Sequence, residues 1–201
     1  MSVPDTPVAA ASAYNIANAL TVSRLFLVPV FLVLLFADGD PAQLAAGETP
    51  PATRLAACAV FVLAVATDKV DGDLARRRGL VTNFGKIADP IADKALIGAA
   101  LIGLSLLGEL AWWITVVIMA REIGVTLLRF AVLRHGVIAA SHGGKLKTSL
   151  QCLAITLLLV FATGWLHDVA VGVMWVAVAV TAATGVEYVV QAVRLRREAL
   201  R

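Results

Sequence analysis

Four of the aspartates in residues 68–93 fall at helical spacings, in a segment that interrupts an otherwise strongly apolar chain. Asp68 and Asp71 are three positions apart and Asp89 and Asp93 are four apart, so each pair shares one face of a helix. Carboxylate oxygens are the ligands that hard cations prefer, and two such cations about 3.5–4 Å apart can hold a phosphate group during displacement. Because the cluster offers neither histidine nor thiolate, the four aspartates predict a site for two divalent ions, Mg²⁺ or Mn²⁺ rather than zinc.

Small residues accompany the aspartates. Gly72 and Ala75 follow on the face of the first pair, and Gly85 stands between the two pairs. Without bulky side chains there, a flat group such as a nucleotide can approach the backbone, and Arg76 could pair with its phosphate. The alternative for any single aspartate is a solvated cytoplasmic loop with incidental ion pairs to Arg76–Arg78. The fixed spacing of the whole set argues against that alternative.

The elements that must position these residues are apolar helices. The chain has 201 residues, of which 60% are hydrophobic, and its mean hydropathy is +0.86. Such a chain has more apolar surface than a soluble domain can bury, so we expect an all-α integral membrane protein. The apolar runs are continuous rather than alternating, which favours a helix bundle over a barrel. We predict six spans, at about 20–37, 54–75, 91–108, 111–134, 147–164 and 169–193.

The sequence also indicates where the bundle begins and how its aspartate helices are bounded. Residues 1–12 are expected to be a disordered tail, and residues 13–201 a membrane catalytic domain. No basic residue precedes Arg24, so the first apolar run is not expected to be a secretory signal. The second apolar run is too short to cross alone, which predicts a helix that continues through Asp68. Asp89-Pro90 is expected to open the next helix, because proline suits a first helical turn.

Basic residues predict the orientation of the bundle. They gather in the connections after the second and fourth spans and at the C-terminus: Lys69, Arg76, Arg77, Arg78, Lys86, Arg134, Lys145, Lys147, Arg194, Arg196, Arg197 and Arg201. The other connections are acidic or nearly neutral, with Arg54 the exception. By the positive-inside rule, both termini and the aspartate segment face the cytoplasm. The net charge of +3 is therefore mainly a topology signal, and nucleic acid is not expected as a partner.

The chain resembles the CDP-alcohol phosphotransferase family. It matches that family's signature at every position: Asp68-x2-Asp71-Gly72-x2-Ala75-Arg76-x8-Gly85-x3-Asp89-x3-Asp93. A layout of six transmembrane helices with a cytoplasm-facing active site agrees with the family's fold, so the resemblance covers nearly the whole chain. Members transfer a phosphatidyl or phosphoalcohol group from a CDP-linked donor to a hydroxyl and release CMP.

The resemblance implies a role for each signature residue. Asp68, Asp71 and Asp89 are implied metal ligands, and Asp93 both completes the metal set and takes the proton from the acceptor hydroxyl. The implied cytidine diphosphate site consists of Asp68, Gly72, Ala75, Arg76 and Gly85. A homodimer in the cell membrane is also expected, with the active site on the cytoplasmic side.

Three further stretches resemble the glycerol-phosphate branch of the family: residues 15–31, 89–108 and 121–151. That branch transfers the phosphatidyl group of CDP-diacylglycerol to sn-glycerol 3-phosphate, giving phosphatidylglycerol phosphate. The match departs at Ala17, where such sequences usually carry proline, away from the chemistry. Because glycerol 3-phosphate is a dianion, its site needs fixed cations near the metals.

Arg121, Arg129, Lys145 and Lys147 are the candidates to bind the acceptor phosphate. The two arginines are about two turns apart, near one face of the fourth span, where Glu122 is in reach to orient one of them. The alternative for the arginines is a buried ion pair with Glu122 or Glu187. For the lysines it is anchoring by the positive-inside rule.

Other activities stay open from the sequence. Within the family, a phosphatidylinositol-phosphate synthase and a cardiolipin synthase are the alternatives. From another class, acids in a helix bundle can mark a divalent-cation transporter, but such sites lie near the bilayer midplane. Cys58 and Cys152 each lie inside an apolar span, so no disulfide is expected.

Overall fold

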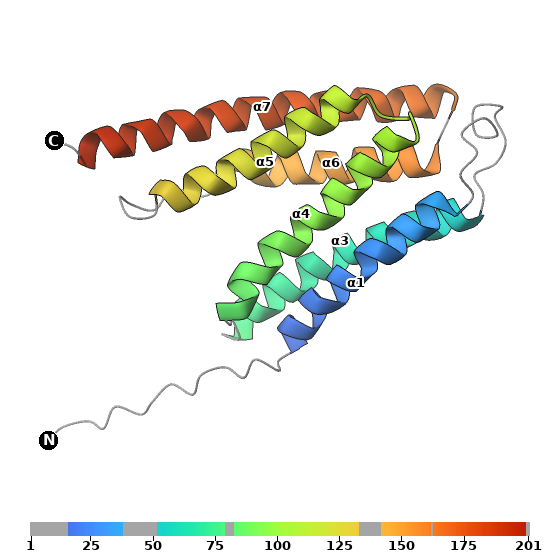
Figure 1. Ribbon diagram of the computed structural model, residues 1–201, viewed down its shortest axis with the longest axis horizontal. Helices are drawn as coiled ribbons and strands as arrows, with labels where there is room; N and C mark the ends of the chain where they lie inside the picture. The colour runs from blue at the N-terminus through green and yellow to red at the C-terminus, as the bar shows by residue number, and fades with distance from the viewer. Residues whose placement is uncertain (1–15, 38–51, 79–82, 133–141, 162, 200–201) are drawn as a thin grey trace, which may run out of the picture.

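The computed structural model describes residues 16–37, 52–78, 83–132, 142–161 and 163–199, with side chains at 22–37, 52–67, 91–92, 94–128, 146–161, 163–194 and 197. Six helices occur in these residues (Figure 1): α1 (Ile16–Phe36), α3 (Ala52–Arg78), α4 (Asn83–Leu106), α5 (Trp112–Val132), α6 (His142–Val160) and α7 (Trp165–Ala199). No strand occurs among them, which confirms the all-α class for the described part of the chain. The predicted tail at 1–12 lies outside the described residues.

The helices form two groups of three. α1 packs on α3 and α4, whereas α7 packs on α5 and α6. Contacts of α3 with α6 and of α4 with α5 join the groups. In Figure 1 the C-terminal ends of α3, α5 and α7 and the N-terminal ends of α4 and α6 all point to the left side of the molecule. The aspartate segment and the candidate acceptor cations therefore belong to the same end of the bundle.

The core between the groups is made of large apolar side chains with no exposed surface. Phe31 of α1 and Phe61 of α3 lie against each other with ring centroids 5.9 Å apart. Leu101 and Leu104 of α4 and Leu158 of α6 complete the same cluster. This contact between α3, α4 and α6 holds the two groups together.

A small residue permits the close packing of α1 on α4. A Cβ atom added at Gly103 would lie 2.5 Å from Leu35 Cδ2, so any larger residue would force the Leu35 side chain of α1 to shift. At Gly98 the added atom would lie 3.0 Å from Met119 Cε of α5. Small residues let helices pack closely, and Gly98 and Gly103 serve that packing inside one chain.

Arg54 holds the opposite end of the bundle together. Its guanidinium donates from Nη1 to Glu109 Oε1 at 2.6 Å and forms an ion pair with the same carboxylate through Nη2. It also donates to the carbonyl oxygens of Leu158 and Leu159, at 3.1 and 2.9 Å, which are left open at the end of α6. Arg54 is only 3% exposed and is paired with Glu109. This ion pair explains why a basic residue occurs in a connection that is otherwise acidic or nearly neutral.

The start of α4 differs from the prediction. The helix begins at Asn83 and continues through Pro90, whereas the sequence predicted that Asp89-Pro90 would open it. Proline removes one helical hydrogen bond, and membrane helices tolerate that loss because neighbouring groups satisfy the freed carbonyl. The predicted continuation of the second span is confirmed, since α3 runs unbroken from Ala52 to Arg78.

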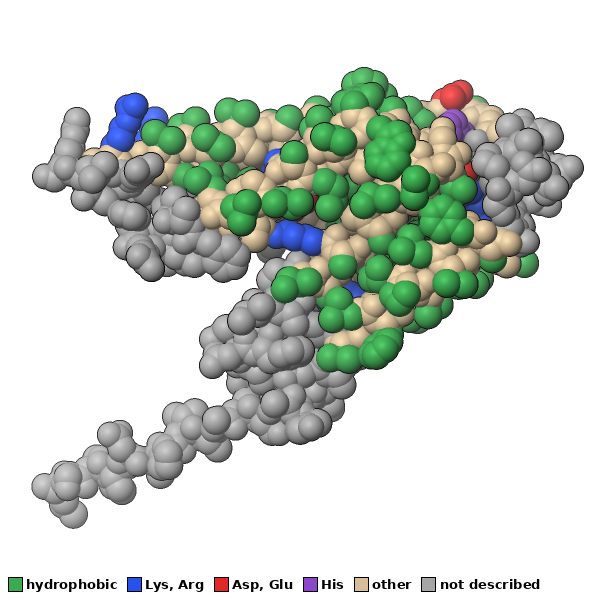
Figure 2. Space-filling model, viewed as in Figure 1, with side chains coloured by type: hydrophobic (Ala, Val, Ile, Leu, Met, Phe, Trp, Pro, Cys, Tyr) green, Lys and Arg blue, Asp and Glu red, His purple; other side chains and the backbone are tan. Residues whose placement is uncertain are grey.

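The outer surface is strongly apolar. Figure 2 shows hydrophobic side chains spread over the described part of one face, with few charged ones among them. Exposed examples are Phe26, Val33, Leu63, Val116, Leu127, Trp165 and Val186. Among the described residues, one helical stretch, Trp165–Arg194, is long and apolar enough to cross a membrane by length and composition. Four shorter apolar stretches lie in α1, α3, α4 and α6, so the six crossings stay a prediction.

Candidate active site

The aspartate pairs lie on the two helices that flank residues 79–82. Asp68 and Asp71 belong to the last part of α3, and Asp89 and Asp93 to the first part of α4. The helical backbone gives each pair a separation of about one turn. The side chains of all four aspartates lie outside the described residues, as do those of Ala75 and Arg76.

The chemistry of this set fits divalent ions. The four carboxylates come from the C-terminal part of α3 and the N-terminal part of α4, two helix ends that point to the same side of the molecule. Carboxylate oxygens suit Mg²⁺ or Mn²⁺. Among the described side chains, which do not include these four aspartates, no group of three or more His, Cys, Asp or Glu is arranged to hold a metal. The aspartate set stays the predicted metal site, and the structure places Gly72 and Gly85 on α3 and α4.

Lys94 ties the aspartate helix to α5. Its Nζ donates to Thr126 Oγ1, and that hydroxyl donates to the carbonyl oxygen of Glu122 at 2.7 Å. Lys94 follows Asp93 directly, so this contact fixes the backbone of α4 beside the second aspartate pair against α5. Sequence reasoning gave neither Lys94 nor Thr126 a role.

Two of the predicted acceptor cations meet at one carboxylate. Arg121 Nη1 of α5 lies 3.2 Å from Glu122 Oε1, and Lys147 Nζ of α6 donates to the same oxygen. Arg121 and Glu122 are each 15% exposed and the Lys147 side chain 7%, so these charges are largely shielded from solvent. Two cations and one carboxylate leave a formal charge of +1. We call Arg121, Glu122 and Lys147 the cation group.

These contacts bear on the alternatives that the sequence left open, and they leave the acceptor role of the cations a prediction. The ion pair of Arg121 with Glu122 is confirmed, and Glu122 also holds Lys147. Lys147 is buried, so it does not serve as an anchor among lipid headgroups. Glu187 is exposed and accepts a hydrogen bond from Gln191 of its own helix. The side chains of Arg129 on α5 and Lys145 on α6 lie outside the described residues.

Polar residues of α7 and α6 support the cation group. Arg121 Nη2 donates to Thr184 Oγ1 at 3.0 Å. Gln151, one turn after Lys147 in α6, donates from Nε2 to Oγ1 of Thr181, one turn before Thr184 in α7, at 3.0 Å. Gln151, Thr181 and Thr184 are buried. Sequence reasoning missed them. Their signal is that polar residues inside apolar spans face the bundle interior rather than lipid.

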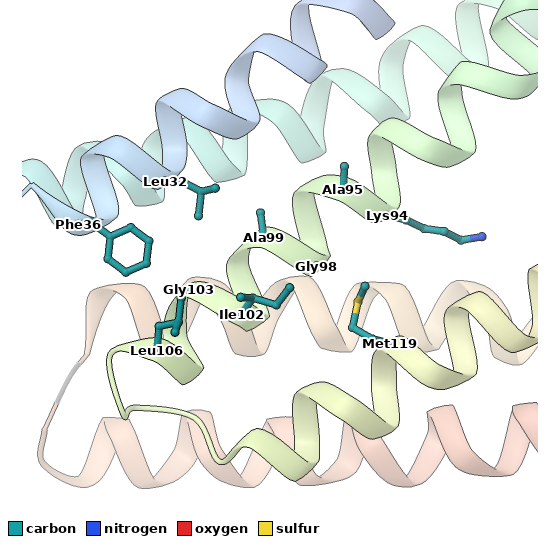
Figure 3. A pocket seen from close by; sticks show the side chains of 10 residues that line it. All are labelled: Leu32, Phe36, Lys94, Ala95, Gly98, Ala99, Ile102, Gly103, Leu106 and Met119. Carbon is teal, nitrogen blue, oxygen red and sulfur yellow. The ribbon is translucent and has the colours of Figure 1, made fainter.

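An apolar groove is lined by residues of α1, α4 and α5 (Figure 3). It has a volume of about 410 Å³. Its floor includes Ala95, Gly98 and Ala99, and Lys94 is the one charged side chain that lines it. Such a surface suits hydrocarbon rather than a phosphorylated alcohol, so the cation group is the better match for a charged acceptor.

Comparison with known proteins gives matches along most of the chain. The model of a family described as CDP-alcohol phosphatidyltransferase matches residues 14–183, a range that includes all four aspartates. A Mycobacterium tuberculosis (strain H37Rv) protein described as "Probable phosphatidylglycerophosphate synthase" is 53% identical over 180 residues, which cover 90% of this chain and 82% of that protein.

Relatives from other bacteria carry a related description. A Bacillus subtilis (strain 168) protein described as "CDP-diacylglycerol--glycerol-3-phosphate 3-phosphatidyltransferase" is 40% identical over 183 residues, covering 87% of this chain and 93% of its own. A Shigella flexneri protein with the same description is 33% identical over 181 residues, with coverage of 87% and 93%. The matches span most of the helical bundle rather than one motif.

Proposed function

Because the chain belongs to the CDP-alcohol phosphatidyltransferase family, we propose that it transfers the phosphatidyl group of CDP-diacylglycerol to sn-glycerol 3-phosphate. The products are phosphatidylglycerol phosphate and CMP. The observation that carries the choice of acceptor is the cation group, where Arg121 and Lys147 from two helices converge on one carboxylate. The descriptions of the relatives at 53% and 40% identity support the same acceptor.

The aspartates would perform the transfer. In the proposed reaction, Asp93 takes the proton from the acceptor hydroxyl, the hydroxyl oxygen forms a bond to the phosphorus of the phosphatidyl group, and the bond from that phosphorus to the CMP oxygen breaks. Mg²⁺ or Mn²⁺, held by Asp68, Asp71, Asp89 and Asp93, would supply neutralisation of the charge on the transferring phosphate.

The donor nucleotide would lie along the start of the same segment. Gly72 and Ala75 of α3 and Gly85 of α4 leave the backbone open to the cytidine diphosphate, with Asp68 beside it. Arg76 supplies a charged hydrogen bond to a donor phosphate. These assignments rest on the family signature, which the chain matches at every position.

The acceptor would be recognised by its phosphate. Arg121 and Lys147 carry a net positive charge within a largely buried site, and Arg129 and Lys145 lie on the same two helices. A phosphorylated alcohol with two negative charges satisfies that excess, whereas an uncharged alcohol leaves it unpaired. The acceptor site therefore favours a phosphorylated alcohol over a neutral one.

We further propose a multi-pass homodimer in the cell membrane with both termini and the active site on the cytoplasmic side. The basic connections after the second and fourth spans support this orientation. The helix ends that carry the aspartates point to the same side of the molecule as the C-terminal end of α5 and the N-terminal end of α6, which agrees with this orientation. CDP-diacylglycerol would then reach the site from the inner leaflet.

The test is CMP release by detergent-purified protein given CDP-diacylglycerol and Mg²⁺ or Mn²⁺. Glycerol 3-phosphate, inositol 1-phosphate and phosphatidylglycerol are compared as acceptors, with and without EDTA. We expect release that depends on glycerol 3-phosphate and stops with EDTA. Release with only one of the other acceptors would overturn the acceptor assignment and keep the chemistry. Release that persists in EDTA would overturn the metal assignment.

A further inference from the structure

Two adjacent residues of α7 form a seat for Arg121. Thr184 Oγ1 accepts a hydrogen bond from Arg121 Nη2 at 3.0 Å. At Gly185, an added Cβ atom would lie 3.0 Å from Arg121 Cγ and 3.6 Å from its Nε. Both α7 residues are buried. The guanidinium is therefore hydrogen-bonded on one side and the stem of the side chain rests on bare backbone.

The hydroxyl of Thr184 is oriented by its own helix. It donates to the carbonyl oxygen of Val180 at 2.8 Å and lies 3.1 Å from that of Thr181. Since a hydroxyl has one proton, its lone pairs remain for Arg121, which can only donate. The seat is thus set before any acceptor arrives, which is the condition for a preorganised binding group.

The seat also completes a unit that spans three helices. Glu122 of α5 accepts from Arg121 and from Lys147 of α6, and Thr184 attaches the same arginine to α7. Arg121 Nε is buried and has no hydrogen-bond partner among the described residues, so the side chain is held at its terminal nitrogens and by packing. A shift of Arg121 would change the spacing between the two cations.

We propose that Thr184 and Gly185 are positioning residues that hold Arg121 for the phosphate of the acceptor. The inference rests on the proposed function and extends it, because it assigns to α7 a part in acceptor affinity. These residues act through Arg121 and do not touch the reacting atoms. Their loss should weaken acceptor binding equally in the ground state and the transition state, which raises KM and spares kcat.

The experiment compares steady-state kinetics of Thr184→Val and Gly185→Ala with the unchanged protein. Thr184→Val keeps the shape and removes the acceptor oxygen, so the KM for glycerol 3-phosphate should rise roughly ten- to hundredfold, the scale for losing one hydrogen bond to a charged group. The KM for CDP-diacylglycerol should not change. Thr184→Ser keeps the hydroxyl and should restore most of the affinity. Gly185→Ala, which makes the arginine stem shift, should give a smaller rise in the same constant.

Matched controls separate this role from helix packing. Gly172→Ala changes another α7 glycine, where an added Cβ would meet nothing within 4 Å. Thr156→Val removes a hydroxyl that donates within its own helix, to the carbonyl oxygen of Cys152. Neither control should alter the KM for glycerol 3-phosphate. In a background of Arg121→Lys, Thr184→Val should have little further effect, because the two residues act on one interaction.

Two results would overturn the inference. One is an unchanged KM for glycerol 3-phosphate in Thr184→Val with the melting temperature preserved. The other is an equal rise in the KM for both substrates, which would indicate general loss of packing. Either result leaves the proposed function intact as long as the unchanged protein uses glycerol 3-phosphate. Failure of the unchanged protein to use that acceptor would instead remove the proposed function itself.

Discussion

Replacing Asp93 with asparagine should abolish CMP release, because the amide does not accept the proton of the acceptor hydroxyl. General-base catalysis contributes roughly 10²–10⁴-fold to the rate, so turnover should fall by at least about 100-fold. Asp68→Asn and Asp71→Asn should also raise the Mn²⁺ concentration needed for half-maximal activity. Mn²⁺ titration of CMP release measures both effects.

Asp168 offers a matched control for these substitutions. It is an exposed acid in the first turn of α7, so Asp168→Asn makes the same chemical change away from the aspartate segment. We expect its activity to equal that of the unchanged protein. Near-normal turnover in Asp93→Asn would remove the assignment of Asp93 as the base.

At the residue scale, the sequence predicted the cations but not what holds them. The aspartate signature is local, so its spacing is visible in the chain, and Glu122 is adjacent to Arg121. Thr184 is 63 positions from Arg121, and nothing in an apolar helix shows which of its faces meets α5. The contact between Lys147 and Glu122 likewise depends on how α6 packs. Long-range partners of charged residues therefore required the structure.

At the scale of helices, the Arg54–Glu109 pair should stabilise the bundle without serving the chemistry. It joins the start of α3 to the end of α6 and to the turn between α4 and α5. Arg54→Met leaves a largely buried carboxylate without its partner, which costs on the order of 3 kcal/mol. Thermal unfolding in detergent should show a lower melting temperature.

The distance between Arg54 and the aspartates provides the discriminating measurement. Asp68 is fourteen positions further along the same helix, about 21 Å away, so both KM values should stay unchanged where the protein is folded. Arg54→Met with Glu109→Leu should recover part of the lost stability, because no unpaired charge remains. Arg194→Met, at an exposed position of α7, is the control and should not change the melting temperature. A single variant as stable as the control would contradict this role.

The extent of a helix was predictable where the length needed to cross a membrane decides it. It was not predictable where the surroundings override the rule that proline opens a helix. The short apolar run before Asp68 required a longer helix, and α3 has it. The start of α4 was placed at Asp89-Pro90 because proline usually opens helices, yet the helix begins at Asn83. Proline inside a helix is costly in water but tolerated in a membrane bundle, so the soluble-protein rule gave the wrong boundary.

At the scale of the whole molecule, the sequence predicted the order of the six helices that the described residues contain but not their grouping. Apolar runs joined by short connections predict a bundle in which successive helices alternate in direction. The division into α1, α3 and α4 against α5, α6 and α7 depends on which faces meet, and helices that are apolar on most sides carry little information about that. Gly103 shows the missing factor, because its bare surface matters only once Leu35 is known to lie on it.

Orientation is the remaining property that charge predicts, and α7 allows a direct test. Its apolar part, Trp165–Arg194, is about 45 Å long, enough to cross a hydrocarbon core of about 30 Å. In a background of Cys58→Ala and Cys152→Ala, Thr163→Cys should react with a membrane-impermeant maleimide added to intact cells. Arg197→Cys should react only after the membrane is opened. Both original residues are exposed, so burial does not block labelling. The reverse pattern would invert the orientation, and labelling of both from outside would show that α7 does not cross.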